Sequence, residues 1–292
     1  MWLLAYPLVG LVVGKRQSRP WIVSDELWSL VESLLPKPGP KLVEGRPSVP
    51  DRQALCRILF VLHTGIQWEY LPQELGFGSG MTCWRRLAAW NEAGVWDQLR
   101  VLLLKKLRSA KKLDWSRAVI DSSHVRAARK GPKSGPSPVD RARPGSKHHV
   151  VTDAQGIPLA VSLTGGNRND VTQLLPLLDQ IPAVAGVVGR PRHRPDALLA
   201  DRGYDHDKYR RLLWQRGIRP VIAKRGEPHG SGLGIFRYVV ERTIAWLHGF
   251  RRLPIRWERR DDIHEAFSLH FPSPTDMPDA FVRTSYSAFC RD

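Results

Sequence analysis

Apolar residues recur at helical spacing through the first third of the chain. The first stripe, spaced at i, i+3, i+4 and i+7, consists of Leu27, Leu30, Val31 and Leu34. Ser24 precedes it and is a residue type that caps helix starts. Asp51 is predicted to cap a second helix, and helical spacing begins again at Met81 and at Val95. Residues 21–112 are therefore predicted to form an all-helical domain, compatible with a helix-turn-helix arrangement.

After residue 112 the pattern changes to short apolar runs that alternate with helical stretches. Strands are predicted over residues 117–121, 148–152, 158–163, 197–200 and 219–224. Helices are predicted over residues 170–180, 205–216 and 236–250. Three consecutive strands followed by alternation with helices favour an α/β fold, with a mixed central sheet and flanking helices. This second domain is expected to cover residues 113–267, which leaves 1–20 as an atypical N-terminal extension and 268–292 as an atypical C-terminal tail.

The charge balance of the chain is strongly basic. Lys and Arg number 45 against 28 Asp and Glu, which gives a net charge of +17. The positive charge is spread along the chain, which favours a nucleic-acid partner over a membrane surface, although a solvated basic surface without a partner is the alternative. The apolar stretch 2–13 is too short to span a bilayer. Three widely separated cysteines indicate no disulfide framework and fit a reducing cytoplasm.

Three acidic residues have settings that suggest chemistry. Asp121 and Asp201 each follow an apolar run of strand character, and ligands of α/β sheets bind at the carboxyl ends of strands. Glu241 lies on a helical pattern, one turn after Arg237. Three carboxylates from separate elements can hold a pair of Mg²⁺ ions for phosphodiester cutting and joining. Taken singly, each aspartate could instead be a turn residue, and the glutamate could form a surface ion pair.

Four segments of the chain resemble the DDE transposases of bacterial insertion sequences, specifically the insertion-sequence-five family. They are IDSSHVRA, KHHVVTDAQGIPLAVSLTGGNRND, LLADRGYD and YVVERTIAWLHGFRRLPIRWERR. The resemblance implies a helical DNA-binding domain followed by an RNase H-like catalytic domain. It implies two Mg²⁺ ions, which Mn²⁺ can replace, carried by Asp121, Asp201 and Glu241. It also implies partners: DNA with terminal inverted repeats, target DNA, and a second copy in a dimer on DNA, in the bacterial cytoplasm on the nucleoid.

Two features depart from the family pattern. The signature around the glutamate is Tyr-x2-Arg-x3-Glu-x6-Lys; here Arg237 and Glu241 match, while Gly234 and His248 replace the tyrosine and the lysine. The tail after residue 267 contains three prolines and no helical period, as a shifted reading frame would produce. Two alternatives to a working transposase follow: an inactive remnant that only binds DNA, and an RNase H-like nuclease that cuts without joining.

Basic residues around the expected site are candidates for DNA contact. They come from the Gly- and Pro-rich segment 126–147, taken as a flexible basic loop or a solvated linker, and from the arginine-rich stretch around Glu241. The tryptophans within that stretch would suit distorted DNA ends, or would pack in the core. The candidates are Arg126, Arg129, Lys130, Lys224, Arg237, Arg242, His248, Arg251, Arg252 and Arg256.

Overall fold

The computed structural model describes residues 19–37, 48–74, 76, 78–226 and 234–270. The expected extension and tail, and the loop before Gly234, therefore lie almost wholly outside the described residues. Within those residues, no helix combines the length and the apolarity that crossing a membrane requires.

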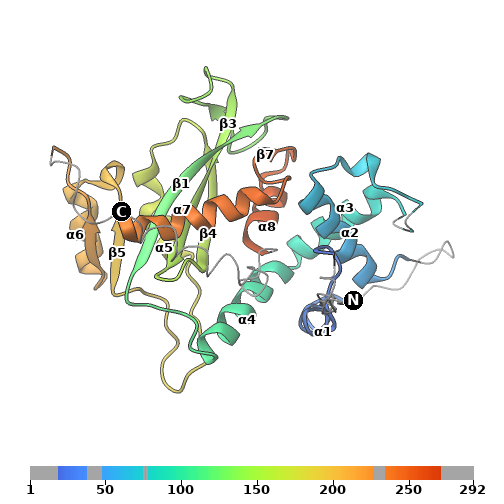
Figure 1. Cartoon of the computed structure of the whole chain (residues 1–292), viewed down its shortest axis with the longest axis horizontal. Helices are drawn as coiled ribbons and strands as arrows, with labels where there is room; N and C mark the ends of the chain where they lie inside the picture. The colour runs from blue at the N-terminus through green and yellow to red at the C-terminus, as the bar shows by residue number, and fades with distance from the viewer. Residues whose placement is uncertain (1–18, 38–47, 75, 77, 227–233, 271–292) are drawn as a thin grey trace, which may run out of the picture.

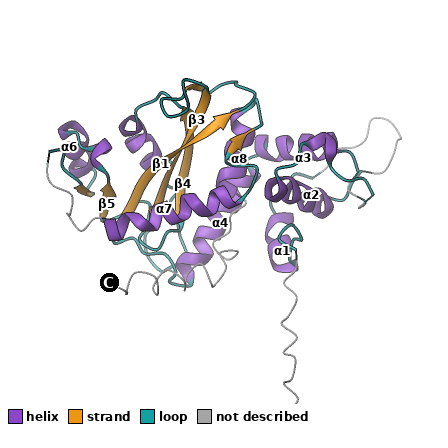
Figure 2. Ribbon diagram, turned by 45° about the horizontal axis from the view of Figure 1, so that its top comes forward, coloured by secondary structure: helices purple, strands orange, loops and turns teal. Residues whose placement is uncertain are grey.

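The N-terminal region is helical, as predicted. Its elements are α1 (Asp25–Glu32), α2 (Asp51–Thr64), the short 3₁₀ helix η1 (Trp68–Tyr70), α3 (Gly80–Glu92) and α4 (Val95–Ser109). The Ser24 hydroxyl accepts a hydrogen bond from the Leu27 N–H at 3.2 Å, which confirms the predicted cap. The cap predicted for Asp51 is wrong, because Pro50 holds that position and Asp51 is the first helical residue. Figures 1 and 2 show α1, α2 and α3 grouped beside the sheet, with α4 leading from this group to it.

The second region contains a mixed sheet in the spatial order β4-β3-β1-β5-β6, as expected for an RNase H-like fold. The strands are β1 (Ala118–Ala127), β3 (Pro144–Asp153), β4 (Pro158–Gly165), β5 (Ala197–Ala200) and β6 (Arg219–Ile222). β3 is antiparallel to β1 and β4, whereas β5 is parallel to β1 and β6 is parallel to β5. Two short strands, β2 (Gly135–Pro136) and β7 (Ile255–Arg256), extend the sheet.

Helices cover both faces of this sheet because its side chains alternate between two apolar clusters. Val119 and Leu199 face one cluster, shared with α7 (Gly234–Gly249), α8 (Asp261–His270) and the N-terminal helices. Ile120 and Ala200 face the other cluster, shared with the end of α4. The second cluster also includes η2 (Asp170–Gln173), α5 (Leu174–Asp179), η3 (Arg202–Tyr204) and α6 (Asp207–Gln215).

Two expectations about this region are wrong. Asp121 does not end its strand, because β1 continues to Ala127 through residues whose side chains are mostly polar. The segment 126–147 is not a single loop, because β2 and the start of β3 lie within it and Lys147 is only 6% exposed. The last described residues form α8, which packs on the core through Ile263, Ala266 and Phe267.

Candidate active site

Asp121 and Asp201 lie side by side on neighbouring strands. The parallel pairing of β1 and β5 sets Val119 beside Leu199. Asp121 and Asp201 each follow two residues later, so they are neighbours as well. Side chains alternate along a strand, and both aspartates therefore point to the face covered by α7. Backbone N–H groups fix both carboxylates: Ser122 donates to Asp121 and Gly203 donates to Asp201, each at 2.8 Å.

Helix α7 brings Glu241 and Arg237 over this pair. The Arg237 Nη2 lies 3.2 Å from Asp121 Oδ2 and 3.5 Å from Glu241 Oε1. Thr243 of the same helix donates to the Gly156 carbonyl at 2.7 Å, in the turn between β3 and β4. Gly156 has a φ of +96°, and a Cβ there would lie 3.0–3.1 Å from α7 side chains, so a glycine lets the helix sit close to the hairpin.

One guanidinium therefore pairs with two of the carboxylates, Asp121 and Glu241. Asp121, Asp201 and Glu241 all raise the pKa of Arg237, although burial opposes them. Burial raises the pKa of Asp121, against the stabilising Ser122 N–H and Arg237, and the negative charge of Asp201 adds to the increase. The Glu241 side chain is 55% exposed and the Asp121 side chain 17%, so the site is open to solvent from the helix side. The three predicted catalytic residues thus come together around Arg237.

Sequence reasoning named His248 as a DNA contact but missed the buried histidines packed near it. Ser123, two residues after Asp121, lies 3.2 Å from His248 through its hydroxyl. His148 pairs with Ser123 across the strands, and its ring nitrogen lies 2.8 Å from that of His264 on α8. Burial lowers the pKa of His148 to about 3, with His248 and His149 adding to the effect. These rings are consequently neutral at pH 7. His148 and His264 must differ in tautomer, since one nitrogen of the pair donates and the other accepts.

A second buried polar group lies next to Tyr204. Lys147 donates to Asp170 and to the Arg168 carbonyl, each at 2.9 Å, while His149 contacts Thr164 at 2.8 Å. Burial raises the pKa of Tyr204, and the negative charges of Asp170, Asp121 and Asp201 add to that increase. Sequence reasoning missed this group because its residues come from separate elements, β3, β4, η2 and η3.

The predicted DNA-contact residues divide by their surroundings. Arg126, Arg129, Lys130, Lys224 and Arg251 are exposed. Arg237 and His248 belong to the carboxylate site and its neighbouring histidines. Arg242 is half-buried and donates to the Gln155 carbonyl at 2.6 Å, so it joins α7 to the hairpin.

Arg252 and Arg256 are corrections to the predicted DNA surface, because both are buried. Arg252 is 3% exposed and forms an ion pair with Glu258 at 2.5 Å. Arg256 is fully buried and donates to the carbonyls of Pro132, Glu258 and Arg259. Their guanidinium groups hold the chain together around β7 and cannot also face a phosphate.

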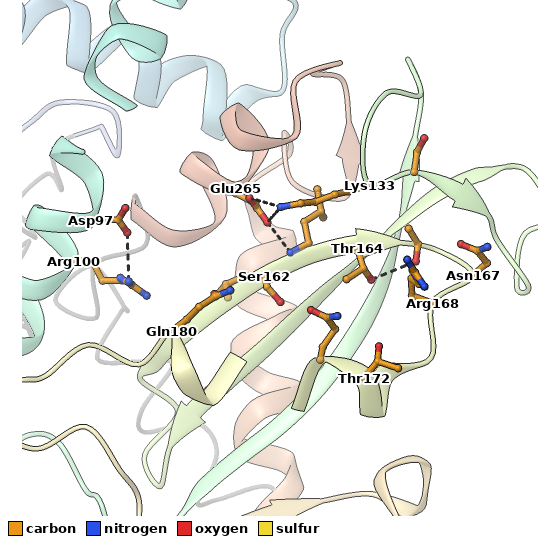
Figure 3. Close-up of a pocket in the computed structure, with 15 residues that line it drawn as sticks. Asp97, Arg100, Lys133, Ser162, Thr164, Asn167, Arg168, Thr172, Gln180 and Glu265 are labelled. Atoms are coloured by element: carbon orange, nitrogen blue, oxygen red, sulfur yellow. Dashed lines mark hydrogen bonds and ion pairs between the residues drawn. The ribbon is translucent and has the colours of Figure 1, made fainter. Parts of the chain in front are cut away.

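Two cavities lie away from the carboxylates. One of about 1130 Å³ follows the outer edge of β4, where Lys133 and Glu265 face each other at 2.8 Å (Figure 3). The other, of about 380 Å³, lies between η1, α3 and the segment after β7. Neither is lined by Asp121, Asp201 or Glu241. Among the described residues, no group of three His, Cys, Asp or Glu side chains is already placed to enclose a metal ion.

Residues 116–271, more than half of the chain, match the family described as "Transposase DDE domain". The chain belongs to this transposase family. Residues 23–100 match a second family, described as "Putative transposase of IS4/5 family". The family resemblance drawn from the four sequence segments is thereby confirmed, and so is the presence of a distinct helical N-terminal part.

Two relatives come from the insertion element IS402 of Burkholderia cepacia. The chain is 68% identical over 136 residues to the "Putative transposase for insertion sequence element IS402", a match that covers 47% of this chain and 64% of that protein. It is 56% identical over 119 residues to the "Insertion element IS402 uncharacterized 16.2 kDa protein", covering 40% of this chain and 81% of that one. The chain thus spans less than two thirds of the first relative.

Solved structures of another transposase show a distant similarity. The Mos1 strand transfer complex has 13% sequence identity and a TM-score of 0.35, over 84% of this chain and 76% of the other. The Mos1 mariner paired end complex with Mn has 13% identity and a TM-score of 0.26, over 86% and 83% of the two chains.

Proposed function

We propose that this transposase cleaves the ends of an insertion sequence and joins them to target DNA, with Asp121, Asp201 and Glu241 as its catalytic residues. The observation that carries the proposal is geometric: Arg237 pairs with Asp121 of β1 and Glu241 of α7, and the pairing of β1 with β5 sets Asp201 beside Asp121. A structural ion pair would need only one of them. Three carboxylates around one guanidinium leave an excess of negative charge, which a bound cation would balance.

The donor set fits magnesium. All three side chains offer carboxylate oxygens, which Mg²⁺ prefers, and Mn²⁺ accepts the same ligands. Asp121, Asp201 and Glu241 would hold two such ions, and bound ions supply Lewis acidity at the attacking and the leaving oxygen of a phosphodiester. Arg237, released from the carboxylates by the cations, would be free to contact a phosphate of the bound strand.

DNA is the substrate class that the charge of the chain favours. The net charge is +17, and Arg126, Arg129, Lys130, Lys224 and Arg251 expose their side chains. The proposed DNA carries terminal inverted repeats, and bringing two ends together with a target requires at least two copies of the chain. The IS402 relatives come from a bacterium, which supports action in the bacterial cytoplasm on the nucleoid.

The test is cleavage of a labelled duplex that carries the end of the element, with Mg²⁺ or with EDTA. Asp121→Asn and Asp201→Asn are expected to lower cleavage at least 100-fold, because each loses a charged metal ligand, while binding to the duplex is retained. Asp207→Asn is the matched control, since Asp207 is exposed on α6.

The products separate the three functions considered. Mg²⁺-dependent cleavage followed by joining to a target supports the transposase. Salt-sensitive binding without any product identifies a remnant, and cutting without joining or end preference identifies a nuclease. Full cleavage activity in either asparagine variant would remove that aspartate from the site.

A further inference from the structure

The cavity of about 380 Å³ lies at the opposite end of β1 from the carboxylates. β1 rises about 20 Å from Asp121 to Ala127, at roughly 3.3 Å per residue, and Ala127 pairs with Arg256, the residue before Trp257 in the cavity wall. The cavity is therefore separate from the site of chemistry. Its volume is near the lower end of the range for small-ligand pockets. Its lining includes Trp68, Met81, Trp84, Arg129, Trp257 and Glu258.

Three indole rings form its walls. Trp68 stacks on Phe267 with ring centroids 6.3 Å apart, and its position is fixed by the closely packed start of α3 at Gly80. The guanidinium of Arg260 lies 5.9 Å from the centre of the Trp84 ring. Trp257 is half-buried and belongs to neither apolar core cluster, so packing in the core does not explain its place.

A buried acceptor lies in the same wall. Glu258 is 5% exposed, and its Oε1 accepts from Arg252 and, at 3.3 Å, from the Trp68 indole N–H. Its Oε2 is buried and has no hydrogen-bond partner among the described residues. A buried oxygen without a donor is costly, and a ligand N–H group at this wall would satisfy it.

Positive charge borders the opening. Arg129 and Arg259 are exposed, and Arg260 is half-exposed with ion pairs to Asp262 and Glu92. Aromatic faces, a buried acceptor and bordering arginines together match the three parts of a nucleotide: the flat base, its amino group and its phosphate.

We propose that this cavity receives one unstacked base of the bound DNA strand, held between Trp257 and Trp84, with its amino group toward Glu258 and its neighbouring phosphates on Arg129 and Arg259. Cytosine, adenine and guanine carry such an amino group and thymine does not. The inference rests on the proposed function only in taking DNA as the ligand. It adds a holding site about 20 Å from the carboxylates, at the border between the helical region and the sheet domain.

Binding of single-stranded oligo-dC and oligo-dT to the full chain tests the proposal. We expect tighter binding of oligo-dC and quenching of tryptophan fluorescence when it binds. Trp257→Ala should weaken oligo-dC binding about 5- to 150-fold, which is the range that stacking of one base supplies. Trp257→Phe should restore much of that loss, because it keeps an aromatic face. Trp214→Ala is the matched control, since Trp214 is 60% exposed on α6 and outside the cavity.

The readouts also separate this proposal from the catalytic one. Trp257→Ala should weaken oligo-dC binding equally in Mg²⁺ and in EDTA, so the result does not depend on whether the chain cleaves DNA. Equal affinity for oligo-dC and oligo-dT in the unaltered chain would overturn the proposal, and this comparison does not depend on the folding of any variant. A folded Trp257→Ala chain that binds oligo-dC like Trp214→Ala would overturn it as well, while leaving the cleavage experiment intact.

Discussion

Arg251 and Arg252 are neighbours in the sequence, yet their side chains have opposite surroundings. Arg251 is exposed just after α7, whereas Arg252 is 3% exposed and donates to Glu258 and to the Ile66 carbonyl. A buried carboxylate depends on its partner, because a charge left alone in the interior is poorly solvated. Arg252 therefore has a structural role, whereas the neighbouring Arg251 is the candidate for DNA binding.

Replacing each arginine by alanine should give contrasting results. Arg252→Ala should lower the free energy of unfolding by about 3–5 kcal/mol, because Glu258 loses its partner, and adding Glu258→Ala should recover part of that loss. Arg251→Ala should change the free energy of unfolding by less than about 0.5 kcal/mol and should weaken DNA binding at low salt. Urea denaturation and a salt series of DNA binding measure both effects. Similar stability of the two single variants would contradict the assigned burial.

Elements, more than single residues, decide which predictions succeed. The strand predicted over residues 197–200 has the same bounds as β5. Its four apolar residues lie between two aspartates, which define both ends of the buried segment. β1 was predicted too short, since its second half, SSHVRA, has polar side chains and is held by pairing with β3. The order of strands and helices was sufficient to bring Asp121 and Asp201 together, even though the expected end of β1 was wrong.

The interior arginines and histidines could not be predicted from local pattern. Arg256 is buried because the Pro132 carbonyl and the Ser146 hydroxyl accept its hydrogen bonds, and those residues are more than a hundred positions away. His148 and His264 pair across 116 positions in the same way. The resemblance of the sequence motifs to a known family identified the three carboxylates. The spacing of apolar residues carries no information about polar contacts between residues so far apart in the sequence.

The junction between η1 and α3 has a backbone contact that only glycine permits. A Cβ on Gly80 would lie 1.8 Å from the Trp68 carbonyl oxygen, a clash with backbone that no side-chain rotation relieves. This close approach holds η1 against the first turn of α3 and fixes Trp68 in the cavity wall.

Gly80→Ala should therefore lower the free energy of unfolding by at least about 2 kcal/mol, since the two elements must move apart. Gly249→Ala is the control, because a Cβ there meets nothing within 4 Å, and it should be neutral or slightly stabilising. Thermal unfolding of the two variants gives the comparison. A Gly80→Ala chain as stable as Gly249→Ala would show that η1 and α3 do not pack this closely.

For the molecule as a whole, the buried histidines make stability depend on pH. Burial lowers the pKa of His148 to about 3 and that of His149 to about 4, and it also lowers the pKa of His264. In the unfolded chain these rings bind protons below about pH 6.5. In the folded chain they stay neutral at that pH, so protonation favours the unfolded state. Stability is then lost as the pH falls from about 6.5 toward 4. Asp153 acts in the opposite direction, since burial raises its pKa to about 6 and the fold gains stability as it protonates.

Among the described residues, six histidines with lowered pKa values oppose two aspartates with raised ones, Asp121 and Asp153, so the net effect of acid should be a loss of stability. Each histidine contributes about 1.4 kcal/mol per pH unit within its window, so the melting temperature should fall clearly between pH 7 and pH 5. His148→Gln should flatten this dependence, because glutamine keeps a polar group near the Nε2 position and does not titrate. His193→Gln should leave the dependence unchanged, since His193 is exposed. A melting temperature that stays constant or rises between pH 7 and pH 5 would mean that the histidines are not held neutral in the interior, and that the polar network behind the carboxylates is more open to water than their burial indicates.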